Sequence, residues 1–344
     1  MDLFKNKKIL ITGGTGSIGQ EILREILKYE PAVVRIIDID ETKQFELQQE
    51  YEDYENIRLL LGDIRDKERL YRAIEDIDIV FHTAALKHVL ACEYNPFEAV
   101  KTNVIGTQNL IDVCMDEEVE KVIFTSSDKA VNPTNVMGAT KLLAERLITS
   151  ANYYKGARKT VFSSVRFGNV LGSRGSVIPL FKKQIARGGT VTITDNEMTR
   201  FIMPLRDAIN LLFKATELAQ GGEIFIFKME ALRITDLAEV MIEELAQNYG
   251  HSQDNIKMEI IGNKPGEKLY EELMTEDEAR RALESKDMFI VLPEMKELSH
   301  IDLSLYSSTT QAKIRAYTSK DEKHLAKEEI KEILYQENLI EEVK

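Results

Sequence analysis

The stretch KKILITGGTGSIGQEILREI, residues 7–26, contains the signals that decide the fold. Its first part is an apolar run typical of a buried parallel strand, and its last part has the apolar spacing of an amphipathic helix. Between them, Gly13, Gly16 and Gly19 have the spacing G-x-x-G-x-x-G. Glycines in such a turn let the backbone approach a pyrophosphate, which binds at the N-terminus of the helix. The stretch therefore predicts a dinucleotide site at the start of a βαβ unit.

The same alternation of strand and helix patterns continues to about residue 170. We expect buried strands at 7–12, 32–37, 57–61, 77–81, 119–125 and 159–165, and helices at 18–29, 97–117 and 136–154. This order predicts an α/β fold with a doubly wound parallel sheet, the Rossmann arrangement.

After residue 170 the elements become shorter. The spacing predicts helices near 176–187, 206–219 and 234–247 and strands at 191–194, 223–227 and 257–261. We predict a dinucleotide-binding domain over 1–170, a smaller α/β substrate domain over 171–300 and a helical tail over 301–344. The strand and helix near 205–228 are candidates to return to the first domain. Residues 320–343 have the pattern of a charged amphipathic helix, on the surface or at an oligomer contact.

The composition narrows the class of protein. Of the 344 residues, 43% are hydrophobic and 30% are charged, as in a globular protein. The net charge of −13 argues against nucleic acid or an anionic membrane as the main partner. No apolar run approaches the roughly 20 residues that span a bilayer, and the start of the sequence has no signal-peptide pattern. Cys92 and Cys114 have neither metal-binding nor disulfide spacing. We expect a cytoplasmic protein with no metal, no nucleic acid and no membrane insertion.

Acidic residues at the strand ends indicate which dinucleotide is bound. Asp38 follows the glycines by about 20 residues, where a carboxylate accepts hydrogen bonds from the adenosine ribose. Ile39 comes next instead of an arginine that could hold a 2′-phosphate, so we expect NAD rather than NADP. Asp63 is expected to contact the adenine amino group, unless it only caps a turn. The expected cofactor residues are Gly13, Thr15, Gly16, Ser17, Ile18, Asp38, Asp63, Ile64, Ala84, Ala85, Lys87 and Lys141.

Several long motifs follow one another between about residues 5 and 280. They are TGGTGSIG, HTAALKHV, CEYNPFEAVKTNVIGT, SSDKAVNPTNVMGATK, RFGNVLGSRGSVIPLF, ITDNEMTRFIMP and PGEKLYEEL. Together they resemble the nucleotide-sugar 4,6-dehydratases of bacterial polysaccharide and glycan biosynthesis, the polysaccharide biosynthesis protein family. These are extended short-chain dehydrogenase/reductases that act on UDP-N-acetylglucosamine or a close relative.

One motif points to a subgroup. In SSDKAVNPTNVMGATK (126–141), Met137 stands where the superfamily normally has a catalytic tyrosine, and Lys141 follows four positions later. This form resembles the retaining dehydratases, which keep the configuration at C5. Two departures stand out. Retaining members often carry an N-terminal membrane region, whereas this sequence starts at the first strand pattern, and HVL (88–90) replaces the usual HVP.

The resemblance implies a role for each residue of this motif. Asp128 would be the acid at O6 and Lys129 the base at C5, which requires a neutral Lys129 whose pKa is lowered by burial or positive charge. Ser127, in preference to Ser126, would hydrogen-bond the 4-oxygen. Lys141 would hold the nicotinamide ribose and favour loss of the 4-hydroxyl proton. Met137 cannot carry a proton and would pack against the sugar or in the core.

The substrate side has fewer local signals. Arginine suits a diphosphate, because its guanidinium group forms paired hydrogen bonds; surface salt bridges are the alternative explanation. The expected substrate residues are Lys87, His88, Asn169, Arg174, Ser176, Val177, Arg200 and Glu267. The expected partners are a UDP-linked amino sugar and a second copy of the chain, in a homodimer or higher homo-oligomer formed through helices 97–117 and 136–154.

Other functions remain open at this point. A C5-inverting dehydratase, an enzyme for a GDP-linked substrate and a nucleotide-sugar 4-epimerase would share the fold and the oxidation at C4. A non-enzymatic NAD-binding regulatory protein would keep the fold and lose catalysis. Only the loss of the tyrosine supports that last alternative, and the intact Asp128, Lys129 and Lys141 count against it.

Overall fold

The computed structural model describes residues 2–173, 175–262, 266–298 and 300–340. Within these ranges the centre is a ten-stranded sheet with the order β16-β14-β15-β10-β6-β5-β4-β1-β2-β3. The seven strands from β10 to β3 run parallel, and β15, β14 and β16 add to one edge in antiparallel pairs. The predicted α/β fold with a doubly wound parallel sheet is confirmed.

The strands of the large sheet are short and mostly buried. They are β1 Lys8–Thr12, β2 Val33–Asp38, β3 Ile57–Leu61, β4 Ile79–His82, β5 Lys121–Thr125, β6 Val161–Arg166, β10 Ile224–Phe227, β14 Ala282–Glu284, β15 Met288–Val291 and β16 Thr310–Gln311. In β1, the consecutive residues Ile9, Leu10 and Ile11 are all fully buried. Consecutive burial requires cover on both faces of the sheet, since neighbouring side chains of a strand point to opposite faces.

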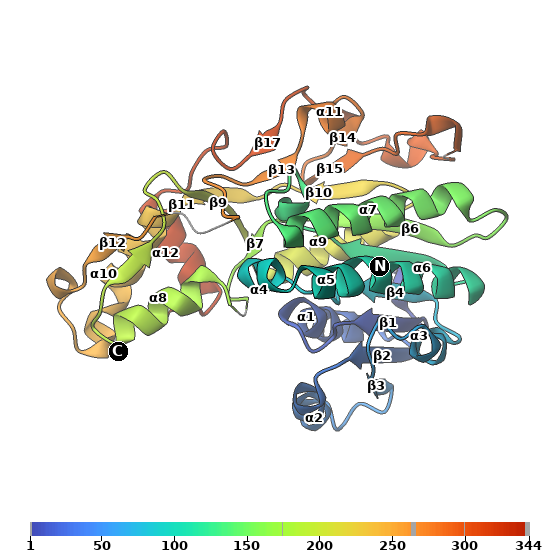
Figure 1. Cartoon of the computed structure of the whole chain (residues 1–344), viewed down its shortest axis with the longest axis horizontal. Coiled ribbons are helices and arrows are strands. Elements are labelled where there is room, and N and C mark those ends of the chain that lie inside the picture. The colour runs from blue at the N-terminus through green and yellow to red at the C-terminus, as the bar shows by residue number, and fades with distance from the viewer. Residues whose placement is uncertain (1, 174, 263–265, 299, 341–344) are drawn as a thin grey trace.

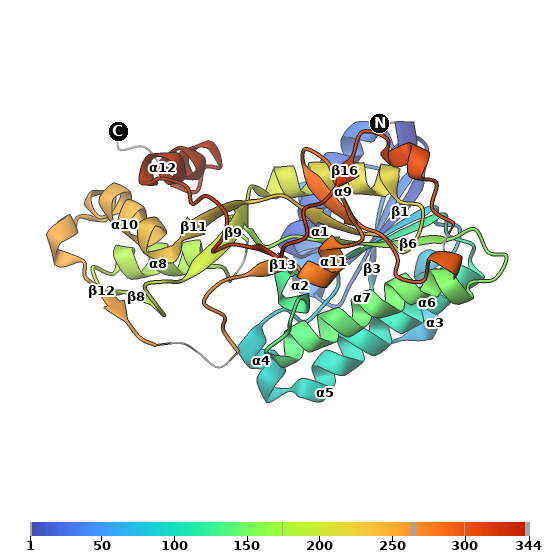
Figure 2. The same ribbon diagram turned by 90° about the horizontal axis from the view of Figure 1, so that it is seen from above.

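Helices provide that cover (Figure 2). On one face, α1 (Ser17–Ile26) packs against α9 (Leu205–Leu218), and on the other α6 (Gly106–Asp116) packs against α3 (Lys67–Ile74) and α7 (Val136–Tyr154). The remaining helices of this part are α2 (Glu41–Glu50), α4 (Val89–Tyr94) and α5 (Pro96–Ala99).

A smaller lobe lies beside the large sheet and has its own apolar core (Figure 1). Its strands are β7 Asn169–Val170, β9 Thr199–Met203 and β11 Glu230–Arg233 in one sheet, and β8 Val191–Ile193 and β12 Met258–Ile260 in another. Its helices are α8 Val177–Ala186, α10 Ile234–Leu245 and α12 Lys327–Gln336. Phe181, Met241 and Leu334, one from each helix, are buried together in the core of this lobe.

The chain passes between the two parts more than once. β10 is a strand of the large sheet, and α9 packs against β10 and β6 of that sheet. In sequence, both elements lie between elements of the small lobe. β13 (Glu272–Met274) pairs with β17 (Tyr317–Thr318), and the short helix α11 (Glu276–Ala279) leads back to β14. The division at residues 170 and 300 stays a prediction.

Two helices differ from their expected ranges. The C-terminal helix is only Lys327–Gln336, because residues 320–326 form turns and a bridge to β11. The expected helix at 97–117 consists of α5, a π-helical segment at Val100–Ile105 and α6. In that segment the buried Asn103 side chain accepts a hydrogen bond from Leu86 N (2.8 Å) and donates to Leu86 O (3.0 Å). The irregular turn therefore fixes the loop that follows β4.

A buried charge cluster joins the C-terminal segments to the sheet. Arg166, at the end of β6, is 1% exposed and lies between Glu145 of α7 and Glu278 of α11. Arg166 Nε donates to Glu145 Oε2 (2.8 Å), and Nη1 donates to Glu278 Oε2 (2.9 Å) and to Leu273 O (3.1 Å). Burial raises the pKa of Glu278, but the charge and hydrogen bonds of Arg166 outweigh it and lower the pKa to about 2.

Candidate active site

A cleft of about 810 Å³ lies at the carboxyl ends of the parallel strands. Open α/β sheets bind their ligands at this edge. The lining runs from the glycine loop through the ends of β2, β4 and β5 to residues 167–176. It includes every predicted cofactor residue and all five predicted catalytic residues: Gly13, Thr15, Gly16, Ser17, Ile18, Asp38, Asp63, Ile64, Ala84, Ala85, Lys87, Ser127, Asp128, Lys129, Met137 and Lys141.

The glycine loop is packed too closely for side chains. Gly13 has a φ of +68°, and a Cβ atom there would lie 2.7 Å from the Cα of Ala84. A Cβ on Gly19 would lie 2.5 Å from the Cα of Gly14. Gly16 is the N-cap of α1 and has no side-chain cap, so the first amide groups of the helix remain available to an anionic ligand. This geometry fits a dinucleotide pyrophosphate.

The carboxylates at the adenosine end are held by neighbouring donors. Asp38 Oδ2 accepts hydrogen bonds from Thr15 N (3.1 Å) and Thr15 Oγ1 (2.7 Å), which ties the end of β2 to the glycine loop. Asp63 Oδ2 accepts from Arg65 Nε (2.7 Å). Burial raises the pKa of Asp63, but the hydrogen bonds and charge of Arg65 outweigh it and lower the pKa. Arg65 and Lys43 both line the cleft, and sequence reasoning missed them.

The Asp128–Lys129 pair lies at the end of β5, in a short 3₁₀ turn. Lys129 Nζ is 2.9 Å from Asp128 Oδ2 and 3.1 Å from Oδ1, and Ser127 Oγ donates to Asp128 Oδ1 (2.7 Å). Burial raises the pKa of Asp128, but Lys129 and Ser127 outweigh it and the pKa is lowered. Burial lowers the pKa of Lys129, but Asp128 and Glu271 outweigh it and the pKa is raised. The expectation of a lowered Lys129 pKa is therefore wrong for the protein alone, because two carboxylates face the amine.

Helix α7 brings Met137 and Lys141 to the cleft. Met137 is 4% exposed and packs with Cys92 and Ala99 as well as lining the cleft. Lys141 Nζ donates to Thr125 O (2.8 Å), and burial lowers the pKa of Lys141 to about 8. Gly138 allows the start of α7 to lie against the Asp128 turn, because a Cβ there would lie 2.2 Å from the carbonyl oxygen of Lys129.

The predicted substrate residues separate into two groups. Lys87, His88, Asn169 and Ser176 line the cleft, whereas Val177, Arg200 and Glu267 do not. Arg174 lies outside the described residues. The hydroxyl groups of Ser176 and Ser126, which also lines the cleft, are buried and have no hydrogen-bond partner within the described part of the chain. Unpaired buried hydroxyls at a cleft are available to a bound polar ligand.

Glu271 is a residue of the site that sequence reasoning missed. It is 4% exposed, its Oε1 accepts from Asn169 Nδ2 (2.9 Å), and its Oε2 accepts from Phe201 N (3.0 Å). Oε1 is also 3.8 Å from Lys129 Nζ and 3.4 Å from Arg200 Nε. The two adjacent glutamates in KLYEEL were the only local signal, and they do not show which of the two faces the site.

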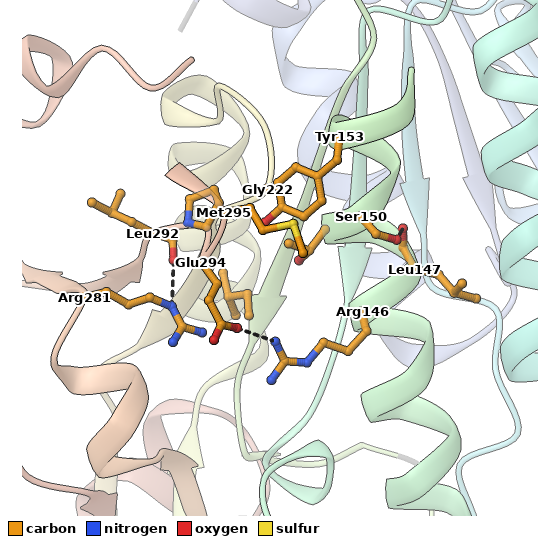
Figure 3. Close-up of a pocket in the computed structure, with 12 residues that line it drawn as sticks. Arg146, Leu147, Ser150, Tyr153, Gly222, Arg281, Leu292, Glu294 and Met295 are labelled. Atoms are coloured by element: carbon orange, nitrogen blue, oxygen red, sulfur yellow. Dashed lines mark hydrogen bonds and ion pairs between the residues drawn. The ribbon is translucent and has the colours of Figure 1, made fainter. Parts of the chain in front are cut away.

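A second cavity, of about 260 Å³, lies between α7 and the segment after β15 (Figure 3). Arg146 of α7 faces Glu294 at 3.8 Å, and Arg281 Nε donates to Leu292 O (2.9 Å). This cavity has no glycine loop and no close carboxylate–amine pair among its lining residues, so it does not offer the chemistry of the main cleft.

The described ranges contain neither a metal-binding cluster nor a membrane-spanning helix. No group of three or more His, Cys, Asp or Glu residues there could hold a metal ion. No helix in the same ranges is both long and apolar enough to pass through a bilayer.

A doubly wound sheet with this glycine loop and α7 lysine has the architecture of the extended short-chain dehydrogenase/reductases. Within that class, the chain belongs to the polysaccharide biosynthesis protein family, whose model matches residues 9–293. A Methanocaldococcus jannaschii protein named as an uncharacterized membrane protein is 60% identical over 333 residues, 97% of this chain and 96% of that protein. A UDP-N-acetylglucosamine 4,6-dehydratase (inverting) of Campylobacter jejuni is 44% identical, covering 86% of this chain and 85% of the enzyme.

Other relatives and structures bear on the same choice of functions. A UDP-glucose 4-epimerase of Rickettsia rickettsii is 36% identical, covering 99% of this chain and 98% of that protein. The crystal structure of Pen from Bacillus thuringiensis is 51% identical with a TM-score of 0.92, covering 98% of this chain and 100% of that one. A dTDP-glucose 4,6-dehydratase of Streptomyces venezuelae, solved with NAD, shares the fold at 22% identity and a TM-score of 0.67, covering 76% and 86% of the two chains.

Proposed function

We propose that the protein is an NAD-dependent 4,6-dehydratase of UDP-N-acetylglucosamine, or a close nucleotide-linked N-acetylhexosamine, that retains the configuration at C5. The observation that carries the proposal is the 2.9 Å contact between Lys129 Nζ and Asp128 Oδ2 in the cleft that also contains the glycine loop. Elimination of water needs an acid and a base side by side, and this pair can supply both. The name of the Campylobacter relative supports the same reaction.

Oxidation at C4 would come first. NAD, held by the glycine loop and Asp38, would accept a hydride from C4 and later return it to C6. Ser127 would hydrogen-bond the 4-oxygen. Lys141, whose pKa is about 8, would place a positive charge close to the 4-oxygen and favour loss of the hydroxyl proton. The 4-ketone then acidifies the proton on C5.

Elimination requires the neutral form of the Asp128–Lys129 pair. The directions of their pKa shifts indicate a carboxylate and an ammonium group at rest. Transfer of one proton across the 2.9 Å contact gives a carboxylic acid and a free amine, which are the acid and base that the reaction needs. Lys129 would then take the C5 proton while Asp128 protonates the leaving O6 hydroxyl. After C6 receives the hydride, Lys129 returns its proton to C5.

The proposed retention at C5 follows from the same accounting. One base that removes the C5 proton and returns it from the same side preserves the configuration. Met137 offers no second base, since a thioether carries no proton at neutral pH. The Campylobacter relative is named as inverting, which is the opposite of the retention at C5 that we propose for this protein. Reduction of the 4-ketone places a proton on C4, and the proton NMR couplings of H5 in the reduced product then distinguish the two outcomes.

The deciding experiment incubates the purified protein and NAD with UDP- and GDP-linked hexosamines and measures product mass. Loss of one water from the UDP-linked substrate supports the proposal. Lys129→Ala should abolish solvent deuterium incorporation at C5, and Asp128→Asn should stop after C4 oxidation and accumulate bound NADH. A product of unchanged mass would instead support a 4-epimerase, the second candidate that the Rickettsia relative favours. Absence of any product with all substrates would favour a non-catalytic role.

A further inference from the structure

We propose that Glu271 restores the proton of the Asp128–Lys129 pair after each elimination. This inference rests on the proposed dehydration. It assigns a proton-storing function to a residue outside the lining of the cleft.

The contacts of Glu271 join the two halves of the site. One carboxylate oxygen, Oε1, lies 3.8 Å from Lys129 Nζ, 3.4 Å from Arg200 Nε and 2.9 Å from Asn169 Nδ2. The negative charge of Asp128 also acts on Glu271 and raises the pKa of Glu271. Glu271 is thus within reach of Lys129 and of two residues expected to bind the substrate, and it is influenced by the charge of Asp128.

The surroundings of Glu271 favour a stored proton at neutral pH. Its backbone is fixed by Ser319, which accepts from Glu271 N (2.9 Å) and donates its own N–H to Glu271 O (2.9 Å). The charged groups that act on it are Asp128, Lys129, Arg200 and Lys268. Burial raises the pKa of Glu271 to about 7, the charge of Asp128 adds to this effect, and Lys129 and Arg200 oppose it.

Two charged residues flank Glu271 in the same segment, and one of them, Lys268, interacts with Glu271 through its charge. Lys268 Nζ donates to Val131 O (2.7 Å), and burial lowers the pKa of Lys268. Glu272 accepts a hydrogen bond from Asn132 Nδ2 (2.7 Å). Glu272 therefore provides a carboxylate control that is adjacent in sequence to Glu271 but engaged elsewhere.

Proton balance gives Glu271 a task in every cycle. Before elimination, the Asp128–Lys129 pair shares one proton: Asp128 is a carboxylic acid and Lys129 is a free amine, or Asp128 is a carboxylate and Lys129 is an ammonium group. During the reaction, Lys129 borrows the C5 proton and returns it, while the proton from Asp128 leaves in the water molecule. The 4-hydroxyl proton passes to solvent. The pair therefore ends each cycle one proton short, and protonated Glu271 supplies the missing proton and regains one from solvent.

The test compares the first turnover with later ones. Glu271→Gln keeps the shape of the side chain and cannot release a proton. With enzyme in excess over UDP-N-acetylglucosamine, the rate of water loss should stay within about threefold of wild type, because the resting pair already holds its proton. With substrate in excess, kcat should fall about a hundredfold, the lower end of the range for general acid–base groups. The result is a burst of one product per enzyme.

The pH profile and two further variants give independent readings. Wild-type kcat should decrease as the pH rises through about 7, because Glu271 loses its proton there. This decrease should be absent in Glu271→Gln. Glu271→Asp should recover part of the steady-state rate, because it keeps a carboxyl group. Glu272→Gln should show neither the burst nor the altered profile.

The outcomes separate this inference from the proposed function. If the wild-type enzyme dehydrates the sugar but Glu271→Gln slows the first turnover as much as the later ones, Glu271 does not restore the proton and the inference is overturned. It is equally overturned if Glu271→Gln keeps the wild-type kcat. If the wild-type protein removes no water from any substrate tested, the proposed function itself fails.

Discussion

Replacing Arg166 with methionine should destabilise the protein strongly and reverse part of its pH dependence. The guanidinium group is 1% exposed and is the cation between the carboxylates of Glu145 and Glu278. Methionine has a similar length but no charge, so Arg166→Met leaves two buried carboxylates facing each other. Breaking a buried ion pair from one side typically costs about 3–5 kcal/mol.

The structure gives a second route to the magnitude. The pKa of Glu278 is about 2, against an ordinary value of 4.5. At 1.36 kcal/mol per pKa unit, this difference corresponds to about 3 kcal/mol of the free energy of unfolding. A lowered folded-state pKa contributes stability that is fully present above pH 4.5 and is lost as the pH falls towards 2. Between pH 5.5 and 7, the Arg166 cluster of the wild-type protein therefore contributes a constant amount.

The variant should behave differently in that window. Without the guanidinium, the two carboxyl groups are stabilised by protonation, so the deficit relative to wild type should shrink as the pH falls from 7 to 5.5. Urea unfolding followed by circular dichroism suits this protein, which has no tryptophan. Comparing variant and wild type at each pH cancels the contribution of Glu271, which both share.

A matched surface variant provides the control. Arg280 is 58% exposed and pairs with Glu276 and Asp277 on the same short helix, so Arg280→Met should cost less than about 1 kcal/mol at either pH. The reasoning is refuted if Arg166→Met costs no more than this control. It is also refuted if the deficit of Arg166→Met grows, instead of shrinking, as the pH falls.

Three further predictions concern the cofactor preference, the pH dependence of C4 oxidation and the assembly of the protein. Asp38→Ser combined with Ile39→Arg should shift binding from NAD towards NADP, because it removes a negative charge and adds a phosphate partner; nucleotide titrations of both proteins measure the change. The rate of C4 oxidation, followed as NADH absorbance in single turnovers, should fall as the pH rises above about 8, where Lys141 loses its charge, and Lys141→Met should be slow at every pH. The exposed apolar residues Phe97 (63%) and Leu143 (49%) should lie in a homodimer interface, so Leu143→Glu should give a monomer in light scattering whereas the wild type gives a dimer.

Local sequence signals were sufficient for the parts of the cleft that come from one stretch of chain. The glycine spacing, the acid at the end of the second strand and the lysine four residues after Met137 each depend on neighbours within one strand–turn–helix unit. Their side chains line a single cleft in the structure. The roles assigned to them stay predictions.

The rest of the site depends on how distant segments meet. Glu271 reaches Lys129 only because the segment before β13 folds back beside β9, while β13 itself pairs with β17; no local pattern encodes either contact. The raised pKa of Lys129 has the same origin, since it requires the second carboxylate. The length of the C-terminal helix was overestimated, because the charged residues before Lys327 continue the helical pattern. The backbone in that segment instead forms a bridge between His324 and Ala231 of β11.

The return of β10, β14, β15 and β16 to the large sheet limits how parts of this fold can be exchanged between relatives. The small lobe is not one continuous insertion, because α9 and β10 interrupt it and α12 joins it from the far end of the chain. A hybrid made by exchanging one block of gene between relatives would therefore transfer only fragments of the lobe and would leave sheet strands beside foreign neighbours. Under the proposed function, a change of substrate is expected to arise through single substitutions along the cleft, with both parts of the fold inherited together.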